Sequence, residues 1–243
     1  MINKISTKFL TKDTVEFLQD DDKEMKWISD FESVSYGKFL IFIDSNVEEI
    51  WGDVIFKQLS LHDKKVIVKR VKSVEDTKSI TFYSEAVDFL ESNKCNRFDL
   101  VIAIGGGIVL DMVSFVVSTY MRGIPLFMIP TTLIGQTDAS TAGKTCFNSV
   151  NNKNLLGTFY YPIKVYNNIN FLYTNTNRFL RQGFSESFKY GLLNSKILID
   201  QLNEYKVSND KKILKKIINL TIESRIAIRQ IDALASNLGH TFG

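Results

Sequence analysis

Four short apolar segments, each followed by polar residues or glycine, constrain the fold of this chain more than any other feature. They are KFLIFID (38–44), KKVIVKR (64–70), FDLVIAI (98–104) and IPLFMIP (124–130). Short apolar runs of this kind are typical of strands that are buried on both faces of a sheet. Helix-like stretches separate them, at about 46–60, 79–94 and 108–121. Strands that alternate with helices predict an α/β fold with a doubly wound, parallel sheet.

The last third of the chain has a different pattern. From about residue 173 the segments RFLRQGFSESFKYGLLNSKILIDQL and KKILKKIINLTIESRIAIRQI carry apolar residues at i, i+3 and i+4, without strand signals. This spacing indicates helices that bury one face. We therefore expect an α/β domain over residues 1–172 and the start of an all-helical domain over residues 173–243.

Composition excludes several classes of protein. The net charge is +3, and the basic residues are spread along the chain rather than clustered as in nucleic-acid-binding proteins. The two cysteines, Cys95 and Cys146, give neither a zinc pattern nor a disulfide framework. No signal peptide and no apolar run of membrane-spanning length is visible, so we expect a cytoplasmic protein without membrane or nucleic-acid partners. His62 and the acidic run at 20–22 are interpreted as solvated loop residues.

Two loops carry candidate binding groups. In AIGGGIVLD (103–111), a buried strand runs through three glycines into a helix, which allows a phosphate to approach backbone N–H groups. Leu110 occupies the third glycine position of the Rossmann fingerprint, so that motif fails, and a purely structural turn is equally compatible. The loop PTTLIGQTDASTAGK (130–144) places Gln136, Asp138 and Lys144 at the carboxyl end of a strand, where open α/β sheets bind ligands. A solvated loop is the alternative.

Two further candidates lie in the helical part. Glu186 and Lys189, in GFSESFKYG (183–191), share one helix face, which suits either a surface ion pair or a cleft. His240, in NLGHTFG (237–243), is a lone histidine between glycines, and such a residue is more often structural than a ligand.

Together and in this order, these segments resemble the 3-dehydroquinate synthase family of sugar-phosphate cyclases. The matching stretches are IDSN (43–46), EDTKS (75–79), GGGIVLDMVSF (105–115), YMRG (120–123), IPTTLIGQTDASTAGK (129–144), KNLLGTFYYP (153–162), GFSESFKYG (183–191) and NLGHTFG (237–243). They cover most of residues 40–243, and the run from 105 to 162 is the most specific.

The resemblance implies an NAD-binding α/β domain, a helical domain that holds a divalent metal (usually zinc, with cobalt as the alternative), and a homodimer. By position, the cofactor-binding residues would be Asp44, Asn46, Glu75, Lys78, Gly105, Gly106, Gly107, Asp111, Thr131 and Thr132. The substrate-pocket residues would be Arg122, Asp138, Lys144, Lys153, Asn154, Lys189 and Asn237. Glu186 and His240 match two of the family's three metal ligands.

The activity implied by the resemblance is that of a phosphate-eliminating carbon–oxygen lyase of the shikimate pathway, which leads to aromatic amino acids. Its substrate, 3-deoxy-D-arabino-heptulosonate 7-phosphate, carries a carboxylate and a phosphate, which the pocket cations would bind. NAD would take a hydride transiently, phosphate would leave, the hydride would return, and an aldol closure would form 3-dehydroquinate.

The match has departures. Ala142 replaces a second glycine, Val74 replaces a glycine, serines flank Glu186, and Arg225 replaces a pocket lysine. An Arg in place of a Lys keeps the charge but changes reach and geometry.

Two larger gaps lie near the end of the chain. Between Arg225 and His240 the chain is shorter than the family pattern, so that one pocket arginine is missing, and the third metal ligand would lie beyond Gly243. We therefore expect the sequence to be part of a longer protein. The alternative is a fragment or degenerate member that binds NAD without turnover.

Other enzymes share parts of this pattern. Valiolone-type and deoxyinosose-type cyclases are alternatives, although AGK (142–144) is nearer to the Gly-Gly-Lys of dehydroquinate synthases. Metal-dependent alcohol and glycerol dehydrogenases share the fold and the order of glycines, aspartate and paired threonines. They would carry a Thr-Gly-Ser loop after the threonines and would lack a counterpart of KNLLGTFYYP (153–162).

Overall fold

The computed structural model describes residues 3–8, 14–25, 36–60 and 63–231. Three residues discussed above, His62, Asn237 and His240, lie outside these ranges. The predicted metal-ligand role of His240 and the pocket role of Asn237 therefore stay predictions.

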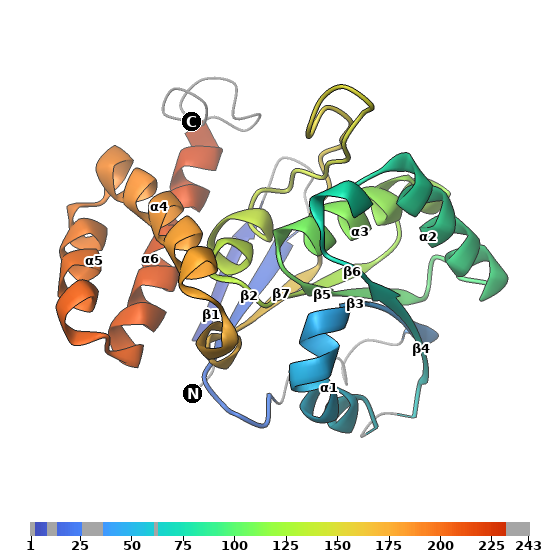
Figure 1. Cartoon of the computed structure of the whole chain (residues 1–243), viewed down its shortest axis with the longest axis horizontal. Helices are drawn as coiled ribbons and strands as arrows, with labels where there is room; N and C mark the ends of the chain where they lie inside the picture. The colour runs from blue at the N-terminus through green and yellow to red at the C-terminus, as the bar shows by residue number, and fades with distance from the viewer. Residues whose placement is uncertain (1–2, 9–13, 26–35, 61–62, 232–243) are drawn as a thin grey trace.

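Within the described residues, a seven-stranded sheet forms the centre of the molecule (Figure 1). The strand order is β1-β2-β7-β6-β5-β3-β4; β1 is antiparallel to β2, and the other six strands run parallel. The bounds are β1 (Asn3–Lys8), β2 (Thr14–Asp20), β3 (Lys38–Asp44), β4 (Lys65–Val71), β5 (Leu100–Gly105), β6 (Leu126–Pro130) and β7 (Lys164–Asn168). This confirms the predicted α/β fold.

The sheet is doubly wound because helices cover both of its faces. Side chains alternate along β3, so that Leu40 and Phe42 join one core while Ile41 and Ile43 join the other. Helix α1 (Ser45–Ser60) packs on the second core, whereas α2 (Ile80–Ser92) and α3 (Gly107–Thr119) pack on the first. The order in which strands are added to the sheet reverses between β3 and β5, and a ligand crevice is expected beyond the carboxyl ends of these two strands.

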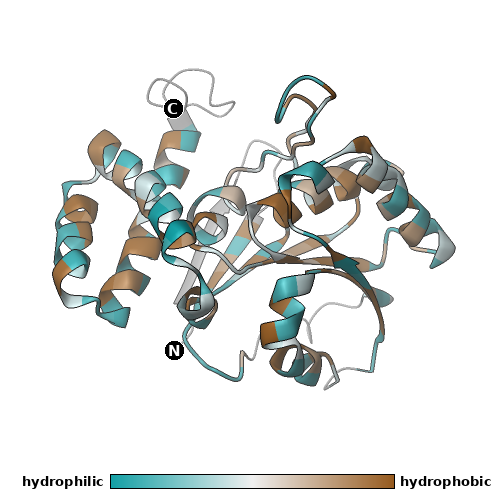
Figure 2. Ribbon diagram, viewed as in Figure 1, coloured by the Kyte–Doolittle hydropathy of each residue, from teal (hydrophilic) through white to brown (hydrophobic). Residues whose placement is uncertain are grey.

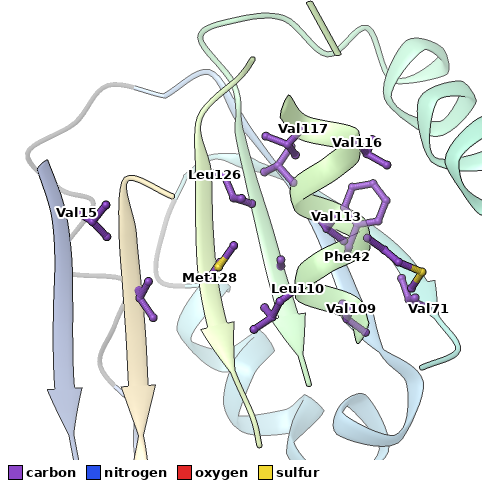
Figure 3. Packing of buried hydrophobic residues seen from close by; sticks show 14 of the residues in the cluster. Val15, Phe42, Val71, Val109, Leu110, Val113, Val116, Val117, Leu126 and Met128 are labelled. Carbon is purple, nitrogen blue, oxygen red and sulfur yellow. The ribbon is translucent and has the colours of Figure 1, made fainter. Parts of the chain in front are cut away.

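Helix α3 is apolar along most of its length because it lies between the sheet and the surrounding loops. Val109, Val113 and Val116 are fully buried. Figure 3 shows them on α3, close to Phe42 and Met128 of the strands. Tight packing on this face fixes the start of α3 at the end of β5.

In the part of the chain that the structure describes, three helices follow the sheet and form a group at its side (Figure 1): α4 (Asn177–Asn194), α5 (Lys196–Ser208) and α6 (Lys211–Ile231). Figure 2 shows these helices as alternating apolar and polar bands, in contrast to the largely apolar central strands. Among the described residues, the core between these helices is small, with four buried members: Tyr190, Leu198, Ile217 and Ile228. Helix α6 also contributes to the core of the sheet, through Leu214, Ile218, Ile222 and Ile226.

Most expected elements are confirmed with small shifts in their ends. The four expected strands correspond to β3, β4, β5 and β6, whereas β1, β2 and β7 were not expected. Helix α3 ends earlier than predicted because Met121 and Arg122 adopt left-handed backbone, with φ of 49° and 66°, in the turn η3 (Tyr120–Arg122). The predicted domain boundary falls inside the turn η5 (Ile169–Thr174), and the division into two domains stays a prediction.

One interpretation of the acidic run was wrong. Asp20 is not a solvated turn residue but the buried last residue of β2. Its carboxylate accepts hydrogen bonds from the Tyr166 hydroxyl and from Asn168 Nδ2. A buried carboxylate needs such donors, and these come from β7, the neighbouring strand.

No helix in the part of the chain that the structure describes is both long enough and apolar enough to cross a membrane.

Candidate functional site

A cleft of about 1320 Å³ lies at the carboxyl ends of the strands, and residues of α4 and α6 also line it. Its α/β wall includes the end of β3, the glycine turn after β5, the start of α3 and the loop after β6. The opposite wall includes Glu186 and Lys189 of α4 and Arg225 of α6. The cleft is therefore shared between the sheet and the three-helix group.

The glycine turn forms one end of the cleft. Gly106 precedes α3 as its N-cap without a side-chain cap, and Gly106, Gly107 and Ile108 line the cleft. The first N–H groups of a helix have no partner within the helix, and together with its dipole they favour an anion. A Cβ on Gly106 would lie 3.1 Å from Thr132 Cγ2, so a larger residue would press against the threonine pair. This arrangement fits the diphosphate of a dinucleotide.

Asp44 and Asn46 line the cleft from the end of β3. Asp44 is buried, and its Oδ1 accepts a hydrogen bond of 2.9 Å from the Asn46 N–H. This bond fixes the carboxylate at the switch point between β3 and β5. An acceptor at the end of a neighbouring strand is suited to a ribose hydroxyl.

Lys78 lies behind the cleft wall and not in it. Its Nζ is 2.7 Å from Asp111 Oδ2 and 2.7 Å from Asn154 Oδ1. Burial by itself lowers the pKa of Lys78, but the Asp111 carboxylate outweighs it and the pKa is raised. Lys78 was expected to contact the cofactor; in this structure it orients two residues that do line the cleft, Asp111 and Asn154.

Cys146 shares these partners. Its Sγ lies 3.2 Å from both Asp111 Oδ2 and Asn154 Oδ1. Burial raises the pKa of the Cys146 thiol to about 11, and the Asp111 carboxylate contributes. The thiol is therefore a hydrogen-bond donor at neutral pH and not a nucleophile.

A hairpin-like loop over residues 144–159, the olive loop that projects at the top of Figure 1, forms another edge of the cleft. Asn154 has a left-handed φ of 55°, and its N–H donates to Asn148 Oδ1 at 2.8 Å. Asn148 Nδ2 in turn donates to Glu75 Oε1 at 2.8 Å. Lys153 Nζ is 4.0 Å from the same oxygen, and its side chain is 75% exposed. The loop thus brings the hydrogen-bonded amide of Asn154 and the exposed ammonium group of Lys153 to the cleft.

Helix α4 approaches the α/β wall closely because residue 183 is glycine. A Cβ on Gly183 would lie 2.4 Å from Leu133 Cγ, a distance that real structures do not tolerate. Ser187 is also buried in this contact; its hydroxyl donates to Gly183 O and accepts from Thr221 Oγ1 of α6. These contacts account for one of the serines beside Glu186 and set the position of that carboxylate.

Glu186 and Lys189 form an ion pair that faces the cleft. Glu186 Oε2 is buried and lies 2.6 Å from Lys189 Nζ, and among the described residues this oxygen has no further hydrogen-bond partner. A buried carboxylate oxygen with spare acceptor capacity fits a metal ligand. Among the described residues, no group of three His, Cys, Asp or Glu side chains could hold a metal ion, so Glu186 would need ligands from elsewhere.

Two buried arginines of α6 complete this wall. Arg225 forms an ion pair with Asp138 and lies over the Tyr190 ring, 5.5 Å from its centre. Arg229 donates a hydrogen bond to the Ala142 carbonyl. Arg229 was not predicted from the sequence, because an arginine in a lysine-rich amphipathic helix is usually a solvated residue.

The structure brings most of the predicted site residues together. Those that line the cleft are Asp44, Asn46, Glu75, Gly106, Gly107, Asp111, Thr131, Thr132, Asp138, Lys144, Lys153, Asn154, Glu186 and Lys189. Gly105 and Lys78 are buried behind its wall. Arg122 is exposed beyond the far end of α3, so this chain does not bring it to the cleft. Gln136, expected in a ligand loop, is instead buried between the ends of β6 and β7.

Comparisons with known proteins agree with this geometry. Residues 68–182 match the family described as 3-dehydroquinate synthase N-terminal. A 3-dehydroquinate synthase from Sulfurisphaera tokodaii is 40% identical over 192 residues, which are 75% of this chain and 54% of that protein. The chain therefore spans little more than half the length of this relative.

Comparison with solved structures shows that related enzymes share the fold of this chain. The 2-epi-5-epi-valiolone synthase ValA from Streptomyces hygroscopicus, with NAD+ and Zn2+ bound, is 25% identical, with a TM-score of 0.83 over 91% of this chain and 62% of that chain. A 2-deoxy-scyllo-inosose synthase complexed with carbaglucose-6-phosphate, NAD+ and Co2+ is 20% identical, with a TM-score of 0.82 over 96% of this chain and 65% of that chain. On sequence and fold together, the chain belongs to the 3-dehydroquinate synthase family.

Proposed function

We propose that the protein containing this chain is a 3-dehydroquinate synthase. It would convert 3-deoxy-D-arabino-heptulosonate 7-phosphate into 3-dehydroquinate and phosphate, with NAD and a divalent metal. The observation that carries the proposal is the shared cleft, which joins an uncapped helix start on the sheet side to Glu186 and several cations on the helix side.

The α/β wall is suited to the cofactor. The start of α3 would hold the diphosphate, and Asp44 would accept a hydrogen bond from a ribose hydroxyl. Asp111, oriented by Lys78, and the threonine pair after β6 would border the rest of the dinucleotide. NAD would supply a hydride acceptor that returns the hydride within the same cycle.

The opposite wall and the 144–159 loop are suited to the substrate. Lys144, Lys153 and Lys189 are ammonium donors that can bind phosphate or carboxylate oxygens. Asn154 offers an amide in a fixed orientation, since its backbone N–H and its Oδ1 are both hydrogen-bonded. Glu186 would contribute one ligand to the metal, whose chemistry is the polarisation of a substrate oxygen.

Three finer features follow from the family resemblance and form part of the proposal: zinc as the resident metal, a homodimer, and a cytoplasmic location. The metal can be identified by elemental analysis of the purified protein, and the dimer by light scattering.

The test is phosphate release by the whole protein with NAD and zinc. A 3-dehydroquinate synthase releases phosphate from 3-deoxy-D-arabino-heptulosonate 7-phosphate without accumulating NADH. Release only from sedoheptulose 7-phosphate or glucose 6-phosphate would assign another cyclase activity. NADH that accumulates with glycerol or simple alcohols would assign a dehydrogenase.

A matched pair of variants tests the metal site. Glu186→Gln should lower the rate of phosphate release by at least about 100-fold and lower the metal content, since even outer-shell changes at metal sites cost up to this factor. Glu204→Gln is the control, because Glu204 is exposed on α5 and contacts Gln201. Full metal content and activity in Glu186→Gln would refute the ligand assignment.

A further inference from the structure

One face of α6 changes from apolar to cationic where it reaches the cleft. Leu214, Ile218 and Ile222 lie on this face and are buried in the core that the helix shares with the sheet. Arg225 and Arg229 continue the same face at a spacing of seven and eleven residues from Ile218, close to whole helical turns. Unlike most arginines, both are buried, with 7% and 5% exposure, and both line the cleft.

Each guanidinium is held in place by the cleft walls. Arg225 is paired with Asp138 of the π-helical turn η4 (Gly135–Ala139) and lies over the Tyr190 ring. Arg229 lies over the Phe159 ring, 5.9 Å from its centre, in addition to its bond to Ala142 O. Planar cations fixed in this way lose little conformational entropy when they bind a ligand.

The two charges are also close enough to affect each other. Burial lowers the pKa of Arg225, and the charge of Arg229 lowers it further. Arg225 Nε is buried and makes no hydrogen bond within the described residues. A buried donor without an acceptor is costly, and an anionic ligand in the cleft would relieve both the missing bond and the repulsion.

We propose that Arg229, together with Arg225, forms an oxyanion-binding subsite that recognises a carboxylate or phosphate of the substrate. The inference rests on the proposed function, because it assigns a substrate group to the same cleft. It adds a residue that neither the sequence pattern nor the family resemblance assigns to the site. A guanidinium pair in a water-poor wall would select doubly anionic sugar acids over neutral polyols.

The main test compares Arg229→Leu and Arg229→Lys in the whole protein, with Arg97→Leu as the matched control. Arg97 also donates to a backbone carbonyl, that of Met121, but it is exposed and outside the cleft. We expect Arg229→Leu to raise the KM for 3-deoxy-D-arabino-heptulosonate 7-phosphate roughly 10- to 100-fold, the range for a hydrogen bond to a charged group. Arg229→Lys should recover part of this loss, and the affinity for NAD should stay within about 2-fold of wild type.

A sugar phosphate without the carboxylate, used as a competitive inhibitor, identifies the recognised group. If the inhibition constant of sedoheptulose 7-phosphate rises in Arg229→Leu as much as the KM for the sugar acid, the subsite holds the phosphate. If only the KM for the sugar acid rises, the subsite holds the carboxylate. An unchanged KM for the sugar acid would overturn the proposal, and so would an equal loss of NAD affinity, which would indicate a structural role.

A binding measurement separates this inference from the proposed function. Calorimetry with inorganic phosphate and with malonate needs no turnover, so it applies even if the enzyme forms another product. At least one of the two anions should bind wild type and Arg97→Leu alike, and bind Arg229→Leu at least about 10-fold more weakly. The subsite proposal would be overturned if both anions bound wild type and Arg229→Leu equally, or if neither anion bound wild type. A wild-type protein that releases no phosphate would overturn only the proposed function.

Discussion

The sheet region and the three-helix region build the two walls of one cleft by different means. Among the described residues, fourteen form a buried core on one face of the sheet alone, whereas the core between α4, α5 and α6 has four. The sheet wall holds its polar groups in hydrogen-bond networks such as Lys78–Asp111–Asn154. The helix wall instead presents charged side chains from two helices, α4 and α6, to the cleft. The sheet wall is therefore a rigid platform, and the width of the cleft depends on how α4 and α6 dock onto it.

The largest expected effect compares the two cores directly. Ile102 in β5 and Ile217 in α6 are both fully buried. Ile102→Ala should lower the free energy of unfolding by about 4 kcal/mol and Ile217→Ala by about 2 kcal/mol, since a small core with partly exposed neighbours can collapse around the cavity. Urea unfolding measures both values.

The same pair can refute the comparison. An equal loss in both variants would mean that the three-helix group is packed as tightly as the sheet. A larger loss of unfolding free energy in Ile217→Ala than in Ile102→Ala would mean that the three-helix group, and not the sheet, is the more tightly packed region.

A second prediction concerns the sheet wall of the cleft. Because burial raises the pKa of Cys146 to about 11, the thiolate is a minor species at pH 8. Iodoacetamide should therefore alkylate it about 100-fold more slowly than free cysteine, and the rate should rise with pH until about pH 11. The Cys95→Ser variant leaves Cys146 as the only thiol of this sequence. Alkylation at the rate of free cysteine at pH 8 would show that the sheet wall is open to solvent.

The contact between the walls gives a third prediction. Gly183→Ala places a methyl group against Leu133 and should cost about 2 kcal/mol, because a packed core does not accept an added carbon without shifts. Gly191→Ala on the same helix clashes mainly with Ile199 Cδ1, the flexible end of that side chain, and should change stability by less than about 1 kcal/mol. Thermal unfolding of the two variants measures the difference. Equal effects would mean that Gly183 does not pack tightly against Leu133.

The smallest effect is expected at the surface between the regions. Lys215 Nζ of α6 lies 3.2 Å from Asp21 Oδ2, next to the end of β2, and Asp21 is largely exposed. Lys215→Met should lower stability by about 0.5 kcal/mol at low salt and by nothing measurable in 1 M salt, because exposed ion pairs are screened. A loss that persists at high salt would show that this edge holds the regions together by packing.

The sequence predicted the central strands well for a physical reason. In β3 every residue from Phe39 to Asp44 is buried, so the segment is apolar throughout and bounded by polar residues. Strand β7 was missed because it is short and ends in Asn167 and Asn168, which are buried although polar. Asn168 is stabilised by Asp20 and Asp22, almost 150 residues away, and no local pattern reveals such a pairing.

The part of the site that could be predicted is the part whose position follows directly from the order of the strands in the sheet. Glycines and threonines after β5 and β6 necessarily meet at one edge of a parallel sheet. The location of Lys78 behind Asp111 could not be derived in this way, and neither could the burial of Arg229. The acceptor that holds Arg229 is the carbonyl of Ala142, 87 residues away, and a backbone carbonyl leaves no trace in the sequence.

The side chain of Gln136 bridges β6 and β7 where their backbones separate. These strands pair only at two positions within the described residues, and beyond them Gln136 Nε2 donates to Pro130 O at 3.3 Å and to Asn168 O at 2.9 Å. The Gln136 side chain therefore acts as a spacer between β6 and β7, and its length depends on the identity of this one residue. Shortening this side chain by one carbon, as in Gln136→Asn, is thus expected to change the separation of β6 and β7 at the base of the cleft.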